Sequence, residues 1–170
     1  MRGGYKYILY LAIAFIIASA LLLASEGRII KNTIGGEKLF WYSAIAGVII
    51  ALLLRLVLKK SIVAAEKNGQ AISSALIVGM FIFCPVAASS INRTFSNAPV
   101  LCNQYPLLSK STGGSRYTEY CLFMNIRGTE EKFTLEKEIY DSISAPGQIE
   151  LCTQKGILGY EVVKEFKAAN

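Results

Sequence analysis

The first half of the chain consists of long apolar runs separated by short polar segments. The runs are residues 7–25, 39–58 and 68–92, and the only charged side chain in them is Arg55. A helix needs about 20 largely apolar residues to cross a bilayer, because backbone polar groups in hydrocarbon must bond within the helix. None of the runs has a polar stripe, which a helix at the surface of a soluble protein would show.

The pattern therefore predicts an α-helical membrane protein. We expect a membrane domain over residues 1–92, with transmembrane helices at about 7–25, 39–58 and 70–91. The first run could instead be a cleaved signal peptide, but its apolar core is longer than the usual stretch of about 7–15 residues.

The second half of the chain changes to short alternating segments. Five of them predict strands, at about 98–108, 117–126, 132–135, 148–153 and 160–167, and residues 134–144 predict a short helix. Leu122, Met124 and Ile126 would share one face of the second strand, as period-two alternation requires. We expect residues 96–170 to form a small β-rich domain, a barrel or sandwich of SH3-like or OB-like size.

Basic residues are distributed unevenly along the chain. Residues 1–91 hold nine Lys and Arg against three Glu, a net charge of +6, whereas residues 92–170 hold nine charges of each sign. Excess positive charge beside apolar runs is typical of membrane proteins, while a nucleic-acid binder gathers it on a folded face with aromatic residues. The expected partner of these residues is therefore the lipid bilayer and not nucleic acid.

The same residues indicate an orientation in the membrane. Those on the side of the N-terminus are Arg2, Lys6, Arg55, Lys59, Lys60 and Lys67, and those on the other side are Arg28, Lys31, Lys38 and Arg93. Lys and Arg near helix ends favour the cytoplasmic side. The six-to-four bias predicts a multi-pass inner-membrane protein with a cytoplasmic N-terminus and a periplasmic, or otherwise extracytoplasmic, C-terminal domain.

The cysteines also favour an outer location for the C-terminal domain. Cys102, Cys121 and Cys152 lie in that domain, a density that suits an oxidising compartment. All three are disulfide candidates, and one thiol must be left over. Cys102 and Cys121 lie at near-mirror positions about a turn near Thr112, which favours a bridge between them, although the two pairings that use Cys152 stay open.

Small residues at four-residue spacing predict how the helices pack. Such residues let helix backbones approach closely. They are Ser43, Gly47 and Ala51 in the second apolar run, and Ala75 and Gly79 in the third. Packing among the three helices of one chain is the first interpretation, and a homo-oligomer is the alternative.

The chain lacks the residues on which most catalytic and metal sites depend. It contains no His, and its only Asp is Asp141. His-based triads and most zinc sites are therefore excluded, and no phosphate-binding glycine loop or CxxC motif occurs. We expect no catalytic residue, no metal site and no cofactor, and hence a protein that is not an enzyme.

These observations favour a non-enzymatic inner-membrane protein whose outer β domain binds another protein, since exposed strand edges can recruit a partner strand. An immunity or exclusion protein and an accessory subunit of an envelope complex are two versions of this hypothesis. The alternatives are a membrane-anchored thiol-redox protein that uses a free outer cysteine, and a small oligomeric channel.

Overall fold

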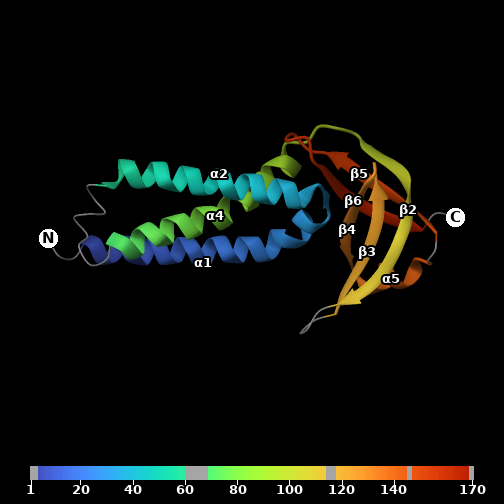
Figure 1. Cartoon of the computed structure of the whole chain (residues 1–170), viewed down its shortest axis with the longest axis horizontal. Coiled ribbons are helices and arrows are strands. Elements are labelled where there is room, and N and C mark those ends of the chain that lie inside the picture. Colours follow the sequence, from blue (N-terminus) through green and yellow to red (C-terminus); the bar gives the residue numbers. More distant parts are fainter. Residues whose placement is uncertain (1–3, 60–68, 114–117, 145–146, 169–170) are drawn as a thin grey trace. The chain divides into compact units, whose positions relative to one another are not determined.

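The computed structural model describes residues 4–59, 69–113, 118–144 and 147–168 (Figure 1). Its contacts divide the chain into two compact units. The helical unit comprises residues 1–27 and 38–90, and the β unit comprises residues 28–37 and 91–170. The β unit therefore includes the segment that joins the first two helices, together with the adjoining helix ends, in addition to the predicted domain 96–170.

The described residues form three long apolar helices: α1 (Gly4–Lys31), α2 (Gly36–Val57) and α4 (Gly69–Thr94). Each is long and apolar enough to cross a membrane. α1 continues six residues beyond the predicted end at residue 25, because Glu26 and Arg28 interrupt the apolar run without ending the helix. Arg28 and Lys31 lie in its last turn, where cations offset the partial negative charge of a helix C-terminus.

Two glycines mark close contacts between helices inside the helical unit. A Cβ on Gly47 of α2 would meet the carbonyl oxygen of Met80 in α4, and it would lie 3.0 Å from the Cβ of Cys84. A Cβ on Gly79 of α4 would meet the ring of Phe15 in α1. α4 is thus in contact with both other helices, and each contact depends on a missing side chain.

The other predicted packing residues are Ser43, Ala51 and Ala75, and they differ in burial. Ala51 and Ala75 are buried, whereas Ser43 is half-buried and its hydroxyl donates to the carbonyls of Leu39 and Phe40 in its own helix. Ala44, which the four-residue spacing did not select, has no exposed surface. The small residues fully buried on α2 are therefore three and four apart, as on one face of a helix.

In the described part of the chain, six strands form one antiparallel sheet that curls into a near-barrel (Figure 1). The sheet order is β1-β6-β5-β2-β3-β4. The strands are β1 (Thr33–Ile34), β2 (Val100–Gly113), β3 (Glu119–Ile126), β4 (Thr129–Leu135), β5 (Gln148–Lys155) and β6 (Glu161–Ala168). Five correspond to predicted strands. β1 was missed, since it comes from the short segment between α1 and α2.

The barrel encloses one apolar core. Leu122, Met124 and Ile126 of β3 are almost fully buried, as period-two alternation predicts. Further members of the core come from β2, β4 and β5 and from the residue that follows the short helix: Leu107, Phe133, Leu135, Ile143, Ile149 and Leu151. Phe166 of β6 packs against this core, with its ring 5.7 Å from that of Phe133.

The short helix α5 (Lys137–Ser142) is held by a lysine from β2. The ammonium of Lys110 donates to the carbonyls of Tyr140 and Ile143, each at 2.6 Å, and lies 4.0 Å from the centre of the Tyr140 ring. A cation at this end of a helix meets carbonyls that have no partner within the helix. Lys110 thus ties the helix to the sheet.

Asn32 closes the gap between the two edge strands of the sheet. Its backbone carbonyl accepts a hydrogen bond from the N–H of Val163 in β6, at 3.0 Å. Its side-chain amide donates to the carbonyl of Thr134 in β4 and accepts from the N–H of the same residue, both at 2.9 Å. The Asn32 carboxamide therefore bonds the outer edge of β4 as a neighbouring strand would. These bonds connect β4 to the other end of the sheet and close it into a near-barrel.

Glycines allow β1 to pass directly into α2. Gly35 has a φ of +69°, a region that side chains disfavour. A Cβ on Gly36 would lie against the carbonyl oxygen of Ile30. The Gly-Gly pair therefore permits the tight reversal that places β1 beside β6.

Candidate functional site

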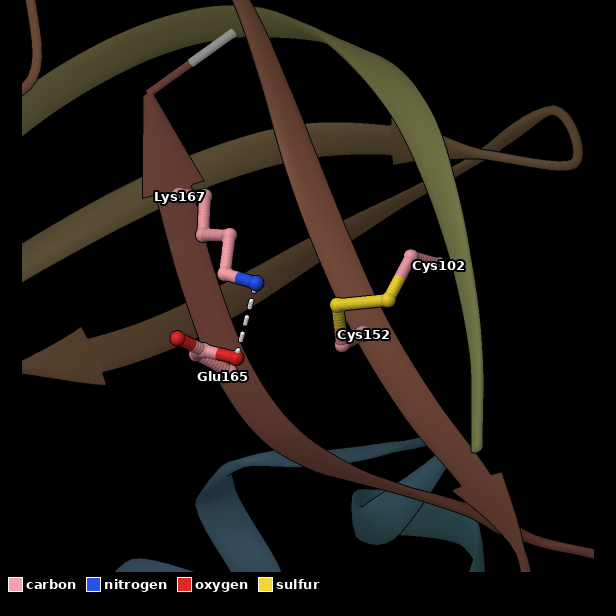
Figure 2. The surroundings of a disulfide bond; sticks show 4 residues. All are labelled: Cys102, Cys152, Glu165 and Lys167. Atoms are coloured by element: carbon pink, nitrogen blue, oxygen red, sulfur yellow. Dashed lines mark ion pairs between the residues drawn. A yellow bond between two sulfur atoms is a disulfide. The ribbon is translucent and has the colours of Figure 1, made fainter. Parts of the chain in front are cut away.

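Two cysteines join neighbouring strands of the β unit. Cys102 of β2 and Cys152 of β5 form a disulfide and are direct partners in the antiparallel register (Figure 2). The predicted bridge between Cys102 and Cys121 is wrong. Cys121 lies in β3, opposite Ser111 at the far end of β2.

The reason for the error is a change of partner in the middle of β2. Residues 100–106 pair with β5, and residues from Leu107 to Gly113 pair with β3. Pro106 stands at the change, where its missing N–H cannot continue a ladder. The prediction placed Cys102 and Cys121 symmetrically about the turn near Thr112, and so assumed that all of β2 pairs with β3. Cys102 instead belongs to the half of β2 that pairs with β5.

The surroundings of the disulfide include charged side chains. Glu165 of β6 is the register partner of Cys152, and it forms an ion pair of 3.1 Å with Lys167 (Figure 2). A carboxylate oxygen of Glu150 and the two sulfurs all lie within 4.8 Å of one another. These three groups resemble a metal-ligand set. A cysteine binds a metal as its thiolate, however, and here the two sulfurs are bonded to each other.

The cysteines outside the disulfide are Cys84 and Cys121. Cys121 is only 3% exposed, and Cys84 is half-buried in α4. A redox nucleophile must be accessible as well as ionised. The buried position of Cys121 therefore weighs against the thiol-redox alternative, because Cys121 is the thiol that the disulfide leaves over in the β unit.

An open strand edge lies at the N-terminal half of β2, in addition to the outer edges of the sheet. Residues 100–106 of β2 pair with β5 on one side, and no other strand among the described residues pairs with their second side. Residues 100–104 are exposed, including the apolar Val100 at 50% and Leu101 at 60%. An unpaired edge with exposed apolar side chains can accept a further strand.

A second asparagine organises the turn between β5 and β6. Asn92, in the last turn of α4, is fully buried. Its side chain accepts from the N–H of Leu158 at 3.0 Å and donates to the carbonyl of Tyr160 at 3.1 Å. Its own carbonyl accepts from the N–H of Ile157 at 3.2 Å. These bonds hold the exposed apolar pair Ile157 and Leu158 beside the end of α4.

Ion pairs attach residues 28–37 to the rest of the β unit. Arg28 pairs with Glu136, and Lys31 pairs with Glu119, each at 2.9 Å. The ammonium of Lys31 lowers the pKa of the Glu119 carboxyl through a hydrogen bond and its charge. All four side chains are more than 40% exposed, so each pair adds little stability and serves mainly to orient the segment.

Sequence reasoning missed Asn32, Asn92 and the partner change at Pro106. Asn32 and Asn92 are polar residues next to apolar runs, and from the sequence such residues indicate only where a helix ends. Pro106 does carry a signal in the sequence, because a proline marks the limit or the edge of a strand, but this signal does not show which strands pair on either side.

Three helices of this length and apolarity fit a multi-pass membrane protein. Comparisons with known proteins found no matching family model, no matching curated protein and no matching solved structure.

Proposed function

We propose that this is an inner-membrane protein with a cytoplasmic N-terminus, whose β unit lies on the outer side of the membrane and binds another protein. The six-to-four bias of basic residues at the helix ends supports this orientation. The disulfide between Cys102 and Cys152 supports an oxidising compartment for the β unit. The near-barrel is of the small size typical of SH3-like and OB-like domains.

The observation that carries the binding function is the open edge at residues 100–106. A partner in extended conformation would add a strand there, with its backbone bonded to the second side of β2. Exposed Val100 and Leu101 would bury apolar surface against the side chains of that strand. The disulfide supports this role, because it fixes the edge to β5 before binding and so reduces the ordering cost.

A binding role is favoured over a catalytic one by the side chains that the chain contains. It has no His and a single Asp, at position 141, and these residues carry most general acid–base chemistry. An immunity or exclusion protein, which intercepts an incoming toxin or phage factor, and an accessory subunit of an envelope complex both fit the proposal.

Photo-crosslinking in cells of the natural source tests the binding edge. A photoreactive residue in place of Asn103, on the open edge, should yield a discrete crosslinked species. The same residue in place of Asp141, exposed on α5, should not. Adding Leu101→Lys should remove the species, because a charge on an edge blocks strand addition. Crosslinks of equal yield at both positions would contradict the proposed edge.

Orientation is tested separately. A reporter that is active only in the cytoplasm, fused after Asn170, should be silent, and the same reporter fused before Met1 should be active. A bright signal from the C-terminal fusion would reverse the proposed topology without affecting the crosslinking result.

A further inference from the structure

A basic cavity of about 220 Å³ lies within the β unit, apart from the open edge of β2. Its lining is Arg28, Ile29, Asn32, Arg93, Val162, Val163 and Lys164. Three of these residues are cations, and the chain brings them together from two helix ends and a strand. The other walls are mainly apolar.

The position of Arg28 and Arg93 has a simple explanation in helix electrostatics. Both lie in the last turn of a helix, α1 and α4 respectively, where positive charge offsets the partial charge of the helix C-terminus. Lys164 has no such role, because it lies on β6. It is exposed, and no ion pair is formed by it among the described residues.

The guanidinium of Arg28 keeps donors for a ligand although it is paired. Its contact with Glu136 uses Nη1, at 2.9 Å, whereas a guanidinium carries five N–H donors. Both partners are more than half exposed, so the pair is readily exchanged for a stronger one. A doubly or singly charged oxyanion would offer such a partner.

The place of Arg28 and Arg93 along the apolar spans points to the source of that oxyanion. Two candidate spans end at Lys31 and Thr94, so Arg28 and Arg93 lie within three residues of a span end. Lipid headgroups occupy this level of a bilayer. The exposed apolar pair Ile157 and Leu158 is bonded to Asn92, the chain neighbour of Arg93.

We propose that the cavity binds the phosphate group of an anionic phospholipid. Lys164 and Arg28 contact the phosphate oxygens, and Arg93 adds positive charge to the same cavity. Ile29 and Val162 line the space for the first carbons of the glycerol and acyl chains. The inference rests on the proposed membrane insertion, and it is independent of protein binding at β2.

Lipid binding to the purified full-length protein in zwitterionic detergent micelles tests the proposal. Thermal unfolding is followed while phosphatidylglycerol, phosphatidylcholine or inorganic phosphate is added. Phosphatidylglycerol should raise the melting temperature, and phosphatidylcholine should not. Lys164→Gln should weaken the apparent affinity for phosphatidylglycerol about fivefold, since one basic residue near a membrane surface contributes about 1 kcal/mol.

The matched control is Lys167→Gln, which removes a charge three residues further along β6, outside the cavity lining, and should bind lipid as the unaltered chain does. Both variants should melt normally without lipid, because both side chains are exposed. Equal affinity of the two variants for phosphatidylglycerol would overturn the site. A response to inorganic phosphate that depends on Lys164, with no added effect of lipid, would overturn the lipid source and assign a soluble phosphate.

Alkaline extraction of membranes separates failure of this proposal from failure of the proposed insertion. A protein that stays in the membrane pellet but shows no preference for phosphatidylglycerol would refute the cavity alone. A protein released by alkali would refute both.

Discussion

At the scale of single residues, the β unit depends on two asparagines at the ends of apolar helices. Each uses both ends of its carboxamide to bond backbone groups of a distant strand or turn. Buried backbone groups left without a partner are costly. These side chains therefore act as structural parts of the sheet.

Asn32→Ala should destabilise the β unit by about 2–3 kcal/mol, because two hydrogen bonds are lost and the backbone of Thr134 is left partly buried without partners. Hydrogen exchange offers a local measurement, since the N–H of Thr134 should lose protection. Asn103→Ala, at an exposed position of β2, is the control and should change neither quantity. Retained protection of Thr134 in the Asn32 variant would contradict closure of the barrel by this side chain.

Gly156 is the residue against which Asn92 packs. A Cβ at this position would overlap the whole carboxamide of Asn92. Gly156→Ala should therefore cost about 1–3 kcal/mol in unfolding free energy, the usual range for overpacking a site that cannot yield. Gly113→Ala is the matched control, because nothing lies within 4 Å of a Cβ there. Equal thermal stability of the two variants would show that Asn92 moves aside freely.

At the scale of elements, the helical unit is held by close contacts at glycines. Gly47→Ala should lower stability by about 1–3 kcal/mol, because even a methyl group meets the backbone carbonyl of Met80. Gly27→Ala in α1 has open space around the added group and should be neutral or slightly stabilising. Unfolding in detergent compares the two variants, and a Gly47 variant as stable as the Gly27 variant would refute close packing of α2 on α4.

The disulfide between Cys102 of β2 and Cys152 of β5 should stabilise the β unit. The disulfide spans 50 residues of sequence, and in the chain-entropy model closing such a loop contributes about 4 kcal/mol. Cys152→Ser should lower the free energy of unfolding by a similar amount, while Cys84→Ser should change it little. Peptide mapping without reduction should recover Cys102 linked to Cys152. Recovery of Cys102 linked to Cys121 would instead restore the hairpin arrangement.

At the scale of the whole molecule, the two units interleave along the chain. Residues 28–37 belong to the β unit although they include the last turn of α1 and the first residues of α2. They supply β1, the closing side chain of Asn32 and two ion pairs. The predicted domain 96–170 is therefore missing one edge of its own sheet.

A fragment of residues 91–170 should consequently be less stable than the same fragment with residues 28–37 fused to its N-terminus through a flexible Gly-Ser linker. The added segment restores the partner of β6 and the bonds to Thr134. Chemical unfolding of both fragments in an oxidising buffer measures the difference. A fused segment of scrambled sequence is the control, and equal stability with and without the native segment would refute its structural role.

Much of the architecture could be predicted from local patterns. Apolar runs of about 20 residues predicted the three helices, because a helix satisfies its own backbone bonds and its apolar length can be read directly. Alternation along residues 117–126 predicted β3 and its buried face. Five of the six strands were anticipated for the same reason.

Tertiary structure alone decided how these elements combine. The disulfide partner of Cys102 depends on which strand pairs with each half of β2. Pro106 indicates that the pairing changes, but it does not show that the two partners are β5 and β3. β1 has only two residues, too few for any period to show. The role of Asn32 depends on Thr134, 102 residues away. Sequence by itself determined the elements, because their signals are local, whereas closure of the barrel, the disulfide and the basic cavity arise from contacts between segments that only folding brings together.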